Sequence, residues 1–154
     1  MIEKEDHRLY ISLIQENINR MANNCASCKT WLVTLVAGLM AVQATISEIR
    51  SILWIAIVPI ALLYLLDSYY LGIEKRLIKL EQNFVQKLKN KEDCYSDIYN
   101  LDPKYIGTDC EYTWDAMKSY STFPFYGVLL LVVLVLWLSP LFSDLIHINQ
   151  CLSQ

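Results

Sequence analysis

Charged side chains are scarce in this chain of 154 residues. Asp, Glu, Lys and Arg make up 19% of it, whereas an average soluble protein has about 25%. The formal net charge is -3, which excludes the strongly basic surface of a dedicated nucleic-acid-binding protein. Glycine and proline number four each and form no tract, so collagenous and low-complexity chains are excluded as well.

Catalytic patterns are also missing. The sequence has no Gly-rich phosphate-binding loop, no His-Glu-x-x-His motif and no histidine within sequence reach of a plausible nucleophile. We therefore expect no enzymatic activity, no cofactor and no bound metal.

What the sequence has in excess is apolar side chains, which make up 55% of the residues. Three stretches are long enough to cross a hydrocarbon layer of about 30 Å, which takes roughly 20 helical residues. They are 30–47, 51–73 and 119–143. The first two would also suit the core of a soluble helical bundle, but the stretch from Leu32 to Val42 is apolar on almost every face. The sequence therefore predicts an all-α membrane protein with three transmembrane helices.

The positions of Lys and Arg predict how these spans are oriented. Twelve of the 13 lie before residue 30 or within 74–118, and only Arg50 lies between the first two spans. Because Lys and Arg accumulate on the cytoplasmic side of membrane proteins, we expect the N-terminus and 74–118 in the cytoplasm. The connection around Arg50 and the C-terminal tail are then expected outside.

Two segments next to the spans carry apolar side chains at a spacing of three and four residues, which is typical of amphipathic helices. The first is 1–29, which leads into the first span. The second follows the second span, and its apolar positions are Ile73, Leu77, Leu80, Phe84 and Leu88. We expect one continuous helix from about Ile52 to Asn90, which extends into the cytosol as a stalk. Its apolar stripe must pack on the N-terminal helix, on the same helix of another copy, or on both.

Residues 91–118 lose this periodicity and gain turn-forming side chains. We expect a cytosolic loop there, with short helical pieces that partly cover the stalk. The predicted order is therefore a cytosolic amphipathic helix, a transmembrane hairpin, a cytosolic helix with a loop, a third transmembrane helix and an external tail. These regions are 1–29, 30–73, 74–118, 119–143 and 144–154.

Asp67 is the default functional candidate of the membrane part, because it is the only charged residue within a predicted span. If the hairpin turns near residue 49, Lys29 and Asp67 reach nearly the same depth at the inner interface. Two interpretations stay open. In the first, Asp67 forms an interfacial ion pair with Lys29 or Arg20, or a hydrogen bond with Tyr64 or Tyr70. In the second, it is a proton or ion site near the inner mouth of a pathway.

One face of the first span consists of small side chains, which allow two helices to approach closely. Its members are Thr34, Gly38, Ala41 and Thr45. We expect this face and the apolar stripe of the stalk to join copies of the chain in a homo-oligomer. A pore lining is the alternative interpretation of the small face.

Cys25 and Cys28 form a Cys-x-x-Cys pair, a pattern found in zinc sites and in redox-active pairs. The other cytosolic cysteines and histidine lie at no recognised ligand spacing, and no βαβ unit surrounds the pair. We therefore interpret the two cysteines as small, reduced side chains on the packed face of a helix.

Three short runs carry a resemblance to a known group of proteins. The run Ile18-Asn19-Arg20-Met21, followed by the runs from Lys29 to Leu35 and from Leu66 to Arg76, resembles the small bacterial membrane proteins called SLATT proteins. These have an amphipathic helix, a transmembrane hairpin and a cytosolic helix, and the resemblance covers about residues 8 to 90. The third span is an addition to that two-span plan.

The resemblance implies a role in bacterial anti-phage defence. The leading expectation is a self-assembling effector of the bacterial inner membrane, which opens a pore or disrupts the bilayer after a cytosolic trigger reaches the stalk. A soluble defence protein or a nucleotide signal would be that trigger. The alternative is a non-conducting anchor or adaptor that recruits a soluble partner through 1–28 and 73–118, and a third option is an accessory subunit of a transporter.

Overall fold

The computed structural model describes the backbone of residues 2–45, 55–90 and 109–152, and within these the side chains of 5–43, 45, 55–90 and 111–138. The described residues form four helices and no strand. The helices are α1 (Ile2–Thr45), α3 (Ile57–Asn90), α4 (Asp109–Met117) and α5 (Phe123–Leu152). The prediction of an all-helical chain is thereby confirmed for the part that the structure describes.

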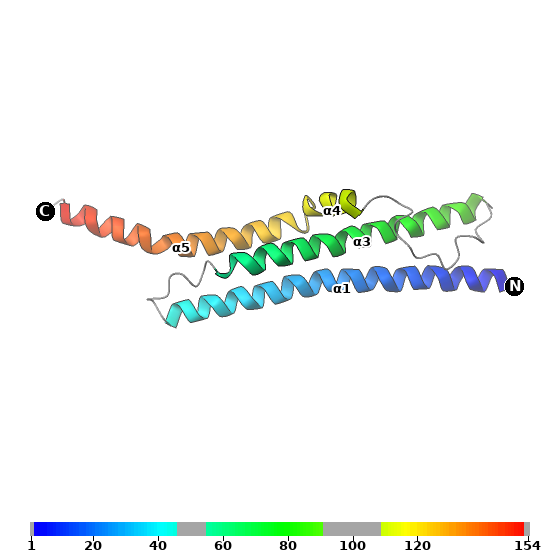
Figure 1. Ribbon diagram of the computed structural model, residues 1–154, viewed down its shortest axis with the longest axis horizontal. Helices are drawn as coiled ribbons and strands as arrows, with labels where there is room; N and C mark the ends of the chain where they lie inside the picture. The colour runs from blue at the N-terminus through cyan, green and yellow to red at the C-terminus, as the bar shows by residue number, and fades with distance from the viewer. Residues whose placement is uncertain (1, 46–54, 91–108, 153–154) are drawn as a thin grey trace.

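The helices lie along one long axis (Figure 1). α1 and α3 form an antiparallel hairpin, and the short α4 lies on the middle of α3. α5 then runs back along the other part of the hairpin, so the N- and C-termini lie at opposite ends of the molecule (Figure 1).

Local sequence explains where several of these helices begin and end. Pro59 and Pro124 lie in the first turns of α3 and α5, where the missing N–H of proline has no helical partner to lose. Lys87 and Lys89 lie in the last turn of α3, where positive charge interacts favourably with the helix dipole.

The hairpin has two parts with separate cores. We call residues 5–28 of α1 together with 68–90 of α3 the stalk, and its core contains Tyr10, Ile14, Met21, Leu77 and Phe84. We call residues 29–45 of α1, residues 56–67, which include the start of α3, and residues 123–138 of α5 the apolar half. Its core contains Leu32, Val36, Ala56, Ile60, Tyr126 and Val133.

α1 and α3 are long and apolar enough to cross a membrane. With 44 and 34 residues, they extend for roughly 66 and 51 Å at 1.5 Å per residue, which is longer than a hydrocarbon layer of about 30 Å. Only 22% of the most apolar window of each helix is buried inside the protein. A core helix of a soluble protein would be mostly buried, so this low burial favours a lipid environment.

The observed helix ends refine the predicted boundaries. The predicted amphipathic helix and first span are one unbroken helix, and so are the described part of the second span and the stalk. The third helix begins at Phe123 instead of 119 and continues through most of the predicted tail to Leu152. The predicted hairpin turn near residue 49 and most of the loop that was expected after Asn90 lie outside the described residues.

Candidate functional site

An ion pair between Lys29 and Asp67 lies at the boundary between the stalk and the apolar half. Lys29 Nζ is 3.2 Å from Asp67 Oδ2 and donates a hydrogen bond of 3.4 Å to Oδ1. The Asp67 side chain is fully buried, whereas the Lys29 side chain is 23% exposed. The Lys29 side chain therefore extends from the surface of the protein to the buried carboxylate.

Polar groups of α1, of α3 and of the turn before α5 lie close to this pair. Cys25 Sγ donates to the backbone carbonyl of Asp67 at 3.6 Å, and Lys29 Nζ donates to Ser121 Oγ, just before α5, at 3.4 Å. Ser68, next to Asp67, is fully buried and donates to the carbonyl of Tyr64 at 2.7 Å. The contact between Lys29 and Ser121 shows that residue 29 of α1 and the start of α5 lie at the same position along the long axis of the molecule.

Two buried oxygens near this level accept no hydrogen bond from the described residues. They are Asp67 Oδ2, which faces Lys29 only through the ion pair, and Thr122 Oγ1. The contacts of Lys29, at 3.2 to 3.4 Å, are longer than the 2.7 to 2.9 Å of a strong charge-assisted hydrogen bond. Lys29 therefore lies between the carboxylate and Ser121, in contact with both.

Arg20, the other predicted partner of Asp67, is not part of this site. Its guanidinium donates to Asn17 Oδ1 on the same helix at 2.9 Å, and the side chain is exposed. The physical reason is reach: Arg20 lies nine residues before Lys29 on α1, which is about 14 Å along the helix axis. Tyr64 does not donate its hydroxyl to Asp67 either, but to the carbonyl of Met117 at 3.0 Å.

The apolar stripe of the stalk is buried within a single chain. Leu77 and Phe84 belong to the stalk core, and Ile73, Leu80 and Leu88 pack against it. The Phe84 ring meets Tyr10 of α1 edge to face, with the ring centroids 4.7 Å apart. Of the packing partners considered for this stripe, the N-terminal helix of the same chain is the one observed. A second copy is not needed to bury it.

α4 is attached firmly to α3. A Cβ added to Gly72 would lie 3.2 Å from the backbone N and Cα of Thr113, so only glycine permits this close approach. Lys79 Nζ donates to the hydroxyl of Tyr112 at 3.0 Å. The expectation that a short helical piece covers the stalk is confirmed for α4. Nothing in the sequence marked this role of Gly72 in packing.

The small face of α1 is exposed within one chain. Thr34, Gly38, Ala41 and Thr45 all lie on the outer side of the hairpin, and a Cβ added to Gly38 would meet no atom within 4 Å. Thr34 and Thr45 donate their hydroxyls to carbonyls of their own helix, at 2.9 and 2.8 Å. The hydroxyls of this face are therefore satisfied, and among the described residues no side chain covers Gly38.

Cys25 and Cys28 are both free and buried, with 6% exposure each. Burial, and secondarily the negative charge of Asp67, raises the pKa of the Cys25 thiol to about 12, and burial also raises the pKa of Cys28. These thiols are protonated at neutral pH, as expected for packed side chains and not for activated nucleophiles. Within the described part of the chain, no three His, Cys, Asp or Glu side chains lie together in a way that could hold a metal ion.

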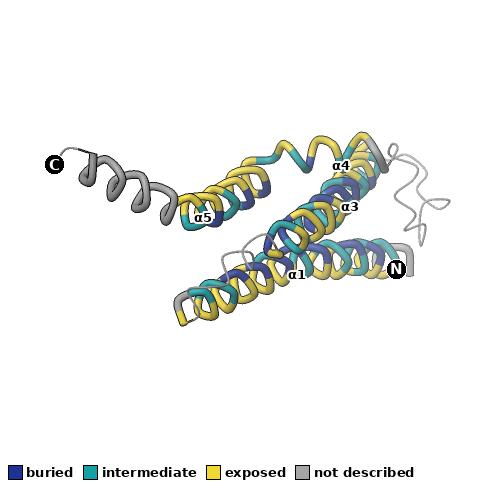
Figure 2. The backbone as a smooth tube through the Cα atoms, turned by 60° about the vertical axis from the view of Figure 1, so that its left-hand side comes forward, coloured by how far each residue is buried: buried dark blue, intermediate teal, exposed yellow. Residues whose placement is uncertain are grey.

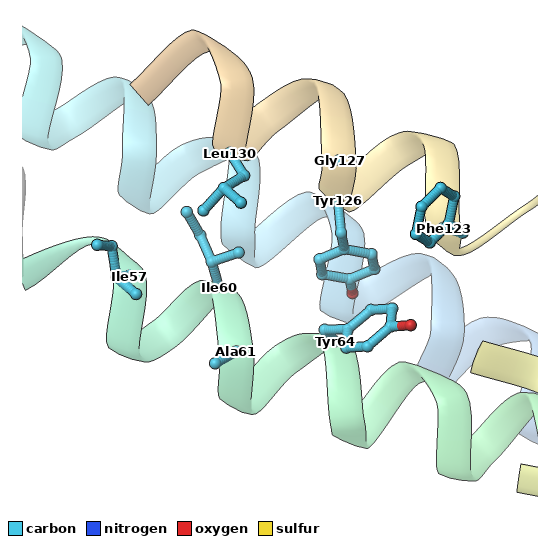
Figure 3. Close-up of a pocket in the computed structure, with 8 residues that line it drawn as sticks. All are labelled: Ile57, Ile60, Ala61, Tyr64, Phe123, Tyr126, Gly127 and Leu130. Carbon is cyan, nitrogen blue, oxygen red and sulfur yellow. The ribbon is translucent and has the colours of Figure 1, made fainter. Parts of the chain in front are cut away.

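Two apolar crevices flank α5. The one between α3 and α5 has a volume of about 370 Å³ and is lined by side chains such as Ile60, Tyr64 and Tyr126 (Figure 3). The two tyrosine rings meet at an angle of 67° with their centroids 5.3 Å apart. Tyr126 donates to the carbonyl of Leu63 at 3.1 Å, so its hydroxyl is satisfied and the crevice presents an apolar surface.

The second crevice, between α1 and α5, is larger, at about 560 Å³. Val33, Ala37 and Met40 line it from α1, and Phe125, Val128 and Val132 line it from α5. Nothing in the sequence marked either crevice, because each depends on the distance between helices that are far apart in the chain.

The part of the chain that the structure describes is all-helical, with two helices long and apolar enough to cross a membrane and an ion pair between Lys29 and Asp67 that joins them. No known protein family, curated protein or solved structure matches the chain.

Proposed function

We propose that the chain is inserted in a membrane by α1, α3 and α5, with the N-terminus and the stalk in the cytoplasm and the C-terminus outside. The distribution of Lys and Arg supports this orientation. So does the position of the two termini at opposite ends of the molecule (Figure 1), since three antiparallel crossings bring the chain to the far side.

Exposed apolar side chains support the position of the bilayer. The large exposed apolar residues concentrate on the apolar half, where Val58, Leu62 and Leu131 are each about 60% exposed. Figure 2 shows exposed residues along α5. Exposed aromatic side chains lie close in sequence to the contact between Lys29 and Ser121, as expected for an interfacial belt. They are Trp31, Tyr120 and Phe123.

A reporter enzyme that is active only outside the cytoplasm tests this topology. We expect activity when it is fused after Gln154 and none when it is fused after Lys91. Activity after Lys91, or recovery of the wild-type protein without detergent, would contradict the proposed insertion.

Within that membrane, we propose that copies of the chain assemble through the small face of α1 and act as an effector of anti-phage defence that permeabilises the bilayer. The main support for assembly through this face is that it is exposed around Gly38, whereas the apolar stripe of the stalk is already buried within one chain. Small residues at such a face let helices pack closely in lipid, where apolar burial alone provides no driving force. Asp67 is fully buried beside Lys29, so a pathway along the small face would not depend on its charge.

Membrane depolarisation in cells that overproduce the protein tests this function. We expect depolarisation by the wild type and its loss in Gly38→Leu, because the larger side chain separates the packed helices. Val58→Leu is the matched control, since Val58 is exposed on α3 and not on the helix that carries the small face, and it should behave as the wild type. Native mass spectrometry should show several copies for the wild type and the control, and fewer for Gly38→Leu.

A non-conducting anchor is the second candidate, and the self-contained stalk favours it. Because Leu77 and Phe84 are buried against α1 of the same chain, one copy already forms a stable cytosolic rod that could bind a soluble partner. A wild-type protein that is strictly monomeric, with normal membrane potential in cells where its function is active, would support the anchor and exclude the pore.

A further inference from the structure

The crevice between α1 and α5 has a charged end. α1 and α5 run in the same direction along it (Figure 1), so their residues can be aligned level by level. Lys29 and Ser121 are in contact, and the lining begins about one turn later, at Val33 and Pro124. It ends at Met40 and Val132, each eleven residues after the contact. The crevice therefore runs from an ammonium and a hydroxyl into the most apolar part of the protein.

This arrangement matches the two parts of a phospholipid. Lys29 is 23% exposed and Ser121 is exposed, so both groups are accessible from outside. In the proposed orientation they lie near the inner membrane interface, where lipid phosphates are found. The volume of about 560 Å³ is within the range of small-molecule sites, and its lining contains no charged side chain.

We propose that this crevice binds one acyl chain of an anionic phospholipid, whose phosphate contacts the Lys29 ammonium and the Ser121 hydroxyl. The proposal rests on the proposed membrane insertion. Lys29 contacts Asp67 and Ser121 and is still 23% exposed, so a third group can reach it from outside. A zwitterionic lipid would bind less well, since its own cationic group competes with Lys29 for the phosphate and is repelled by it.

Lipid retention in native mass spectrometry tests this binding site. The protein is purified in mild detergent and mixed with phosphatidylglycerol or with phosphatidylcholine of the same acyl composition. We expect one phosphatidylglycerol to stay bound, with roughly five-fold less phosphatidylcholine, the difference expected for one partly exposed charge contact. Equal retention of the two lipids would overturn the assignment of the phosphate to Lys29.

Two variants test the acyl-chain part of the site. Ala37→Phe adds a ring inside the crevice and should abolish retention. Ala61→Phe adds the same ring to the crevice between α3 and α5 and is the matched control, which should retain the lipid. Retention by Ala37→Phe at the wild-type level would exclude this crevice.

The headgroup part requires a variant that keeps the fold, because removing Lys29 alone leaves Asp67 buried without a counter-charge. The double variant Lys29→Gln with Asp67→Asn replaces the ion pair by two neutral amides and should lose the preference for phosphatidylglycerol. Arg20→Gln removes a cation outside the crevice and should keep that preference. A double variant that keeps the preference while melting normally would overturn the proposal. Protein found in the soluble fraction would instead overturn membrane insertion, and the lipid site with it.

Discussion

The stalk and the apolar half are built from the same two helices but bury their side chains differently. In the stalk, a continuous core that includes Tyr10, Ile14 and Phe84 joins α1 to α3, and α4 covers part of α3 at the closest distance that Gly72 permits. In the apolar half, α5 lies between two open crevices. Large side chains such as Leu62 point outward and are 61% exposed.

This difference follows from the surroundings that each part requires. In water, an apolar stripe must be covered by the chain itself, since burial contributes about 25 cal/mol for each Å². In lipid, the surroundings are as apolar as the side chains, so helices can separate at little cost and leave crevices that lipid fills. The degree of internal burial therefore distinguishes the part expected in water from the part expected in the membrane.

The largest effect is expected from Phe84→Ala in the stalk core. Phe84 is 3% exposed and packs on Tyr10, so its removal leaves a cavity and should lower the free energy of unfolding by about 3 to 5 kcal/mol. Thermal unfolding followed by helical circular dichroism measures the loss. A cost below about 1 kcal/mol would mean that the stalk core is not packed as described. Because the stripe is already used within one chain, Phe84→Asp would unfold the stalk before it reported on contacts between copies.

The ion pair at the boundary should give the second largest effect. Lys29→Met leaves the fully buried Asp67 carboxylate without its counter-charge, which should lower the free energy of unfolding by about 2 to 3 kcal/mol; the partial exposure of Lys29 reduces the usual 3 to 5 kcal/mol. Adding Asp67→Asn should recover most of that loss. A double variant no more stable than Lys29→Met would show that the two side chains are not coupled.

A smaller effect is expected where α4 lies against α3. Gly72→Ala places a methyl group 3.2 Å from backbone atoms of Thr113, so α4 must shift, at a cost of about 1 to 2 kcal/mol. Gly127→Ala is the control, since its Cβ would meet no atom within 4 Å. Faster proteolysis within α4 in Gly72→Ala, but not in the control, would locate the change. Equal melting of both variants would argue against the close contact.

The buried thiol of Cys25 should give a modest dependence on pH. Its pKa is raised from 9.0 to about 12, so the folded state disfavours the thiolate. The buried neutral thiol therefore contributes fully to the free energy of unfolding below pH 9. This contribution is lost as the pH rises toward 12. Alkylation by a maleimide at pH 8 should be slow in the folded protein and fast after unfolding, and Cys25→Ala should remove the stability loss that belongs to this thiol. Rapid alkylation in the folded state would contradict its burial.

The smallest effect is expected from Leu62→Ala on the outer surface of the apolar half. Because Leu62 is 61% exposed, its truncation should change the free energy of unfolding by no more than about 0.5 kcal/mol. Set beside Phe84→Ala under the same conditions, it measures the contrast between the two parts directly. A loss as large as that of Phe84→Ala would show that Leu62 is covered by protein, for instance by a second copy.

Much of the helical architecture could be predicted because it depends on neighbouring residues. The apolar stretches around Leu32 and Val133, and the spacing from Ile73 to Leu88, indicate helices and their faces without any knowledge of distant contacts. Counting residues on either side of an antiparallel turn also predicted that Lys29 and Asp67 lie at the same depth. The structure contains that ion pair.

Only the tertiary structure decided which partner each face meets. The apolar spacing of the stalk required a partner but suited α1 of the same chain as well as a second copy, and side-chain packing selected α1. The docking of Thr113 on Gly72, the exclusion of Arg20 from Asp67 and the crevices beside α5 all join residues that are distant in sequence. Periodicity and composition describe each helix by itself, whereas these contacts depend on the separation and rotation of helices relative to one another, which long-range packing determines.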